Sequence, residues 1–281
     1  MIVDAHHHLW EYDAARYPWM TQEYAAIRRR FGPDDLQPTL AACGVTATVL
    51  VQTCSSLDET RTFLEVAAGT RFIAGVVGWV DLATANVAET IEALQSGTVG
   101  RKLVGIRHQV HDEPDPAWLL RPEVQRGVAA VGHAGLAFDL LVRPRELPSA
   151  HATAVRHPEI RFVLDHLAKP PIRAGGSAVW AAWMPRMAEL PNVYCKLSGL
   201  VTEADWQGWS VEQLRPYVER AVSWFGPTRL MFGSDWPVCL VAASYARVLA
   251  TARALVQGLP PAQQQAIFGE TAAAVYRLRL T

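Results

Sequence analysis

The feature that most constrains the fold is a regular alternation of short apolar runs with stretches of helical periodicity. Runs rich in β-branched residues recur at 2–7, 46–52, 72–80, 103–109, 136–142, 160–166, 192–198 and 229–235. Between them, apolar residues recur at helical spacing, as in Val87/Ile91/Leu94 and Val124/Val128/Val131. Strands that are apolar almost throughout are buried on both faces, as in a parallel sheet covered by helices. The pattern therefore predicts an α/β fold.

The number of apolar runs favours a closed barrel. Eight runs match the eight strands of a (β/α)8 barrel, and no G-x-G-x-x-G phosphate-binding sequence follows any of them. An open doubly wound sheet is the alternative, because it produces the same alternation. Single barrels often run to about 250 residues, so we expect one (β/α)8 TIM barrel domain spanning residues 1–281.

Two of the predicted connections are longer than plain turns. Residues 9–33 carry Tyr12, Tyr17, Trp19 and Tyr24, and residues 199–209 carry Trp206 and Trp209. Long loops of compact folds usually shape a site or are disordered, and the aromatic content favours packing. We expect the loop after the first strand to cover the C-terminal mouth of the barrel; the alternative is that these aromatics only cover hydrophobic surface.

Composition excludes several classes of partner. The 26 basic and 27 acidic side chains give a net charge of −1, which argues against nucleic acid and anionic membrane surfaces. The sequence shows no signal peptide and no apolar stretch of about 18 residues. Its cysteines are scattered without C-x-x-C pairing, which predicts reduced thiols and a cytoplasmic location: Cys43, Cys54, Cys195 and Cys239. The residues leave the oligomeric state open, a homo-oligomer included.

Three consecutive histidines end the first predicted strand. Successive strand residues point to opposite faces, so His6 and His8 share one face and His7 takes the other. An H-x-H pair can therefore aim two imidazoles at one point inside the barrel. We expect His7 to pack outward against a helix or to form a hydrogen bond with it.

Two further polar residues strengthen this site. His166 and Asp235 each end a different predicted strand, and the carboxyl ends of barrel strands form the active-site face. Three imidazoles and one carboxylate suit a single Zn²⁺ or similar ion with a position left for water. The alternative for Asp235 is that it caps the following helix, a role that Ser234 could also fill.

The remaining strand ends suggest no covalent nucleophile. Ser198 lacks a G-x-S-x-G sequence, and no cysteine lies beside a candidate base. His111 falls in a loop and is ambiguous. Hydrolysis by an activated water is therefore favoured.

The set of strand-end motifs resembles a known family. DAHHHLW, GIRHQ, DHLAKP, KLSGL and GSDWPV resemble the amidohydrolase superfamily (amidohydrolase-2 type), within its group of sugar lactonases, which includes fuconolactonases and rhamnonolactonases. The resemblance implies a (β/α)8 fold and the opening of lactones to hydroxy acids. It places the family's metal-binding residues on His6, His8, His166 and Asp235.

The same resemblance implies one metal ion at most. Arg107 and His108 stand where binuclear members have a bridging carboxylated lysine, and Asp139 stands where they have a histidine. We expect one divalent ion, with zinc first. The alternative is hydrolysis without a metal, because a lactone is electrophilic enough for cationic side chains to polarise its carbonyl.

A reaction follows as a hypothesis. Asp235 takes a proton from water, and a metal or the three histidines stabilise the carbonyl oxygen. His108, Lys169 or a water held by one of them protonates the leaving ring oxygen. The rivals are a non-oxidative decarboxylase on the same scaffold and a non-catalytic barrel that binds a sugar acid.

The expected substrate is a small neutral sugar lactone. A dicarboxylate would need several arginines, and only Arg107 is well placed, with Arg173 less so. Further residues are predicted to bind the substrate, through aromatic stacking on the sugar or hydrogen bonds to its hydroxyls: Trp10, Trp79, Trp236, Gln52 and Lys196.

Overall fold

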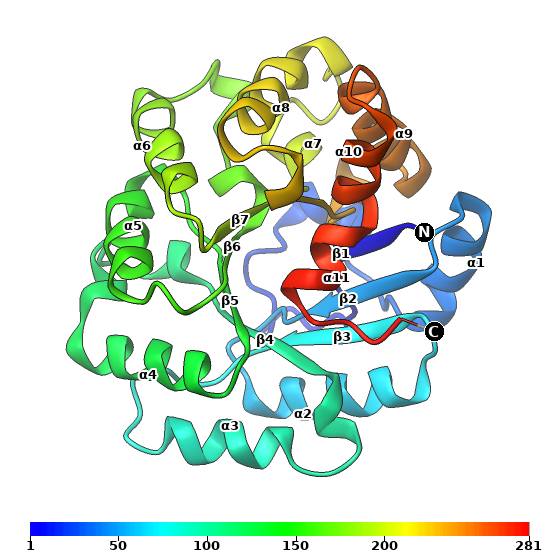
Figure 1. Ribbon diagram of the computed structural model, residues 1–281. Helices are drawn as coiled ribbons and strands as arrows, with labels where there is room; N and C mark the ends of the chain where they lie inside the picture. Colours follow the sequence, from blue (N-terminus) through cyan, green and yellow to red (C-terminus); the bar gives the residue numbers. More distant parts are fainter. Residues whose placement is uncertain (281) are drawn as a thin grey trace.

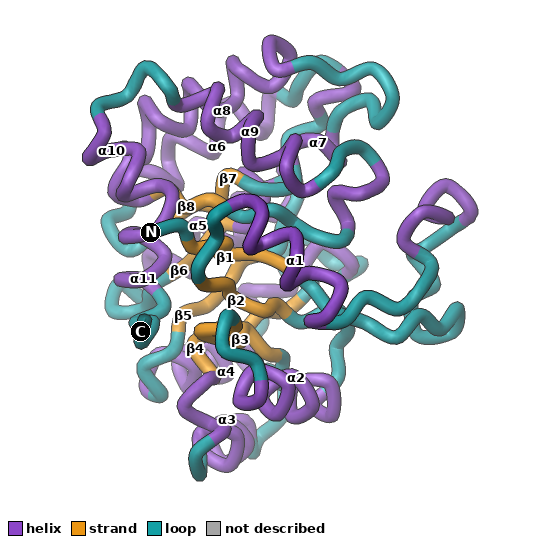
Figure 2. Tube along the Cα trace, turned by 90° about the vertical axis from the view of Figure 1, so that its right-hand side faces the viewer, coloured by secondary structure: helices purple, strands orange, loops and turns teal. Residues whose placement is uncertain are grey.

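The computed structural model describes residues 1–280 and contains one parallel sheet of eight strands in sequence order. All eight lie within the apolar runs predicted from the sequence. They are β1 Val3–His7, β2 Ala47–Val51, β3 Ile73–Gly78, β4 Leu103–His108, β5 Ala137–Leu140, β6 Phe162–Leu164, β7 Val193–Leu197 and β8 Leu230–Phe232. Helices surround the strands (Figures 1 and 2).

The barrel closes between β1 and the segment that follows β8. His7 forms a parallel bridge with Trp236. The amide of His8 donates to the carbonyl oxygen of Trp236 at 2.7 Å, and the amide of Asp235 donates to that of His6 at 2.8 Å. The expected (β/α)8 barrel is therefore confirmed over the open sheet.

Eight helices of nine or more residues cover the strands: α1 Pro33–Cys43, α2 Leu57–Gly69, α3 Val87–Gln95, α4 Pro122–His133, α5 Leu147–Arg156, α6 Ala178–Glu189, α8 Val211–Phe225 and α9 Tyr245–Val256. Ser56, Ser177, Ser210 and Ser244 begin four of them, each accepting a hydrogen bond from the amide three residues later. The short helices α7 Leu200–Glu203, α10 Pro261–Gln265 and α11 Thr271–Val275 complete the set. None of the helices within residues 1–280 is long and apolar enough to cross a membrane.

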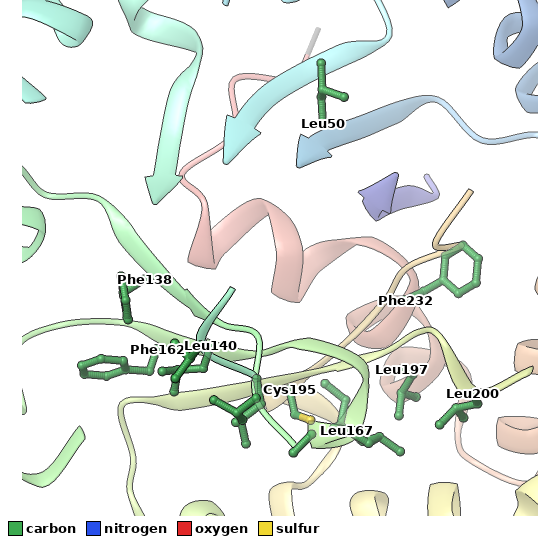
Figure 3. Packing of buried hydrophobic residues seen from close by; sticks show 14 of the residues in the cluster. Leu50, Phe138, Leu140, Phe162, Leu167, Cys195, Leu197, Leu200 and Phe232 are labelled. Atoms are coloured by element: carbon green, nitrogen blue, oxygen red, sulfur yellow. The ribbon is translucent and has the colours of Figure 1, made fainter. Parts of the chain in front are cut away.

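The core has two parts. Between strands and helices lies a large cluster that includes Phe138, Phe162 and Phe232 (Figure 3). Inside the barrel lies a smaller cluster, which the C-terminal segment with α11 covers beside the start of β1 (Figure 1): Val3, Ala5, Val49, Val163, Met231, Val275 and Tyr276. The interior is therefore apolar at its N-terminal end, and its charged side chains lie toward the C-terminal ends of the strands.

Residues of the loop after β1 reach the C-terminal mouth of the barrel. Trp10 and Phe31 exchange two backbone hydrogen bonds of 3.1 and 2.9 Å at the base of this loop. Its Tyr24 ring packs edge-on against Trp206 of the loop after β7, with ring centroids 4.9 Å apart. Trp10, Trp19 and Tyr24 line the cavity at the C-terminal mouth, so this loop shapes the site.

Candidate active site

The four side chains expected to bind a metal meet at the C-terminal mouth. His6 and His8 face each other with their Nε2 atoms 3.1 Å apart. Asp235 Oδ1 lies 3.5 Å from His8 Nε2 and 3.9 Å from the Nε2 atoms of both His6 and His166. All four residues are buried. The structure thus brings together residues that are 229 positions apart in the chain.

His7 points away from this group, as the alternation of strand residues predicts. Its Nε2 atom lies 2.9 Å from Thr48 Oγ1 on β2. The hydrogen-bond partner is therefore a strand residue and not the expected helix, because the neighbouring strand offers a hydroxyl on the same outer face.

Asp235 is not a helix cap. It has a positive φ of 58°, and the next short helix, Val238–Val241, has Pro237 as its N-cap residue and no side-chain cap. Ser234 stabilises the turn instead, because its Oγ accepts a hydrogen bond from the amide of Trp236 at 3.0 Å. The Asp235 carboxylate is thereby left to face the histidines.

Each imidazole is held through the nitrogen that faces away from Asp235. His8 Nδ1 donates to the carbonyl oxygen of Val51 at 2.8 Å, and His166 Nδ1 lies 2.8 Å from Ser198 Oγ. His6 Nδ1 lies 3.1 Å from Lys196 Nζ and 3.3 Å from Asp165 Oδ1. Metal-binding histidines are typically oriented in this way by a carbonyl, hydroxyl or carboxylate.

The protonation states of these groups suit a cation. Burial lowers the pKa of His166 to about 4 and the pKa of His6 well below its usual range, so both rings are neutral at pH 7. The donor atoms of His6, His8 and Asp235 lie within 4.8 Å of one another, as do those of His6, Asp165 and His166. Both groups share His6. The residues therefore fit one divalent ion.

An unusual backbone segment presents His166. His166 to Lys169 are four consecutive residues with left-handed φ values between 49° and 56°. Gly199 packs directly against the His166 ring, since a Cβ atom at Gly199 would lie 2.6 Å from His166 Nδ1. A glycine at this position thus allows the ring to reach Ser198.

A buried cluster of charges lies beneath the histidines. Lys196 Nζ is 2.6 Å from Asp139 Oδ2 and 2.9 Å from Asp165 Oδ1, and Arg107 Nη1 is 2.9 Å from Asp165 Oδ2. Burial alone would raise the pKa of Asp165, but Lys196, His6 and Arg107 outweigh it and lower this pKa well below the usual range. Asp165 was not predicted as a site residue, although it follows β6 directly and precedes His166.

A cavity of about 480 Å³ opens above Asp235. Three of the residues predicted to contact substrate line it, namely Trp10, Arg107 and Lys169, together with His8, His166 and Asp235. Further lining residues were not predicted as site residues: Trp19, Tyr24, Gln109, His111, Asp112, Arg143 and Glu203.

The cavity lining contains an arginine that was not predicted at the site. Arg143, just beyond β5, lines the cavity, whereas Arg173 does not. The sequence offered a signal for Arg143, because it follows the run 136–142 directly. Two arginines, Arg107 and Arg143, therefore line the cavity, where only Arg107 was expected.

Six predicted site residues do not line the cavity, among them His6, which lies behind His8 and Asp235. His108 faces away from it because the neighbouring Arg107 faces inward; His108 Nε2 is 2.8 Å from Glu113, and its Nδ1 accepts from Trp79 Nε1 at 3.1 Å. The others are buried below or beside it: Lys196 in the charge cluster, Gln52 against Arg107, and Trp236 against Phe31.

Comparison with known proteins identifies the family. A family model described as amidohydrolase matches residues 3–278. The chain belongs to this amidohydrolase family. The resemblance seen in its strand-end motifs is thereby confirmed.

Relatives of this amidohydrolase are named as lactonases. An L-fucono-1,5-lactonase of Burkholderia ambifaria is 44% identical over 245 residues, which cover 86% of this chain and 82% of the relative. An L-fucono-1,5-lactonase of Burkholderia multivorans is 41% identical over 98% of this chain and 96% of its own length. A crystal structure of a Burkholderia multivorans amidohydrolase with bound zinc superposes with a TM-score of 0.94 at 40% identity, covering 99% of this chain and all of the other.

Proposed function

We propose that this amidohydrolase hydrolyses a sugar lactone to the open hydroxy acid, with L-fucono-1,5-lactone as the first candidate. The observation that carries the proposal is the contact of Asp235 with three imidazoles at the base of a cavity. The choice of substrate is supported by relatives named L-fucono-1,5-lactonase that are 44% and 41% identical over most of the chain.

We further propose that His6, His8, His166 and Asp235 hold one zinc ion. Their donor set is nitrogen-rich with one carboxylate, which suits zinc, and the outer nitrogens of His8 and His166 are held by Val51 and Ser198. Zinc, when bound, polarises a carbonyl or lowers the pKa of a bound water.

The role of Asp235 is that of general base. Burial would raise the pKa of Asp235, but His166 and His8 outweigh burial and lower it below its usual value. The carboxylate is therefore ionised at neutral pH and accepts a proton from the attacking water. The new bond joins the water oxygen to the carbonyl carbon, and the bond from that carbon to the ring oxygen breaks.

The leaving ring oxygen needs a proton. Lys169 lines the same cavity and its ammonium lies 2.7 Å from Glu203 Oε1. We assign the donor role to Lys169 rather than to His108, which is turned toward Trp79 and Glu113. Trp10 at the cavity wall offers a face for the sugar.

A screen of aldonolactones with a pH indicator tests the function. Acid release from L-fucono-1,5-lactone well above the spontaneous rate is expected, and its loss after chelation is the expected sign of a required ion. No acceleration with any 1,5- or 1,4-aldonolactone would overturn the proposal. A decarboxylase would release CO2 from an aromatic or unsaturated acid and leave these lactones intact. The non-catalytic alternative required Asp235 to be a helix cap, which it is not.

A further inference from the structure

Asp4 is a fully buried carboxylate that the reaction above does not use. Its Oδ1 accepts hydrogen bonds from the amides of His6 at 3.1 Å and Ser234 at 2.8 Å. Its Oδ2 accepts from Ser234 Oγ at 2.6 Å and from Tyr245 Oη of α9 at 2.9 Å. One side chain thus joins the first strand, the segment after the last strand and an outer helix.

The hydrogen bond to His6 lies at an irregularity of β1. Val3 and Ala5 belong to the cluster inside the barrel, so strict alternation would turn His7 inward and His6 and His8 outward. Instead, the pairing register of β1 with β2 shifts between Asp4 and His7, as in a β-bulge. The shift reverses the pattern and turns His6 and His8 toward Asp235.

A bulge removes a residue from regular pairing, and its amide then needs another acceptor. Asp4 Oδ1 supplies that acceptor for His6 from two residues away. The Asp4 side chain therefore stabilises the local backbone, and this backbone determines the direction in which His6 and His8 point.

The Asp4 carboxylate also binds the segment that carries Asp235. Both the amide and the hydroxyl of Ser234 bond to Asp4, and Ser234 directly precedes Asp235. The amide of Asp235 in turn donates to the carbonyl oxygen of His6 at 2.8 Å. These hydrogen bonds therefore hold the H-x-H pair at a fixed distance from Asp235.

We propose that Asp4 is a positioning residue, which locks the bulge of β1 and the Ser234–Asp235 turn so that His6, His8 and Asp235 share one ion. This inference rests on the proposed metal-dependent hydrolysis. Asp4 itself touches neither the cavity nor the reacting atoms.

The variant Asp4→Asn tests the proposal, because the amide keeps the shape of the side chain but replaces one acceptor by a donor. We expect zinc affinity, measured by competition with a chromophoric chelator, to fall roughly tenfold to a hundredfold. We expect kcat on the lactone to fall by a similar factor while KM changes less than threefold. Hydrogen exchange of the peptide containing His6 should accelerate, and this readout needs neither zinc nor activity.

Glu146→Gln is the matched control. Glu146 is also a fully buried carboxylate, and it accepts the amide of Arg143 at 2.9 Å outside the Asp4 network. We expect Glu146→Gln to lose stability but to keep the zinc affinity of the wild type. Equal loss of zinc affinity in both variants, or none in Asp4→Asn, would overturn the positioning role.

Two further outcomes keep the proposal testable. If Asp4→Asn does not fold, Ser234→Ala removes the hydroxyl bond to Asp4, and unchanged zinc affinity there would reject the proposal. If the wild type binds zinc but hydrolyses no lactone, the proposed function is wrong. The zinc affinity and the hydrogen exchange of Asp4→Asn then still test whether Asp4 positions the ligands.

Discussion

His8 donates its Nδ1 proton to the carbonyl oxygen of Val51 across 2.8 Å, and its Nε2 lies 3.5 Å from Asp235 Oδ1. A carbonyl oxygen only accepts hydrogen bonds, which fixes this tautomer of the neutral ring. The partner on β2 thereby prepares a ligand atom on β1.

Removing this ligand should remove the ion. We expect His8→Ala to contain less than about a tenth of the zinc of the wild type, since one of the proposed ligands is lost. Metal analysis after gel filtration measures this. His133→Ala, which changes an exposed histidine at the end of α4, serves as the control and should retain full zinc content. Equal zinc in both variants would contradict the proposed site.

Asp235→Asn should reduce the catalytic rate without affecting the stability of the fold. The amide cannot accept a proton from water, so we expect kcat to fall about 10²- to 10⁴-fold, with a melting temperature close to that of the wild type. Asp205→Asn is the control, because Asp205 is an exposed carboxylate in the loop after β7 and does not line the cavity. Full activity in Asp235→Asn would reject the general-base role.

The sequence predicted the strands and the histidine group because those signals are local. Each strand is an apolar run of β-branched residues, and each proposed ligand follows or ends such a run. The facing of His6 and His8 was predicted from simple alternation, and that conclusion agrees with the structure. The actual cause is different, since the register shift between Asp4 and His7 depends on pairing with β2 and on Ser234 more than 200 residues away.

Long-range packing explains the expectations that failed. Lys196 was expected at the mouth, but Asp139 on β5 and Asp165 directly after β6 hold its ammonium below the histidines. His108 was expected in the site because it ends β4, yet Arg107 takes the inward position there. Neither outcome can be predicted from one strand alone, because each depends on which charges neighbouring strands present.

Gly199→Ala should disturb His166 specifically. Gly199 has a φ of 64°, and an added Cβ would lie 2.6 Å from the His166 ring. A left-handed alanine alone costs about 1–2 kcal/mol, and displacement of the ring should lower kcat at least about tenfold through loss of the Ser198 hydrogen bond. Kinetics and thermal unfolding measure the two effects.

Gly44→Ala isolates the backbone cost. Gly44 has a φ of 69° at the end of α1, and no atom lies within 4 Å of an added Cβ. We expect this variant to lose similar stability with unchanged kcat. Equal kinetic loss in both glycine variants would show that general destabilisation, and not the His166 contact, reduces activity.

Lys196→Met should destabilise the barrel interior. Lys196 is fully buried, and its removal leaves the carboxylates of Asp139 and Asp165 without their shared cation. Breaking a buried ion pair on one side costs about 3–5 kcal/mol, so the free energy of unfolding in urea should fall by about that amount. The exposed pair Arg61 and Asp58 provides the control: Arg61→Met should cost less than about 1 kcal/mol. A Lys196→Met variant as stable as Arg61→Met would mean that Arg107 alone compensates both carboxylates.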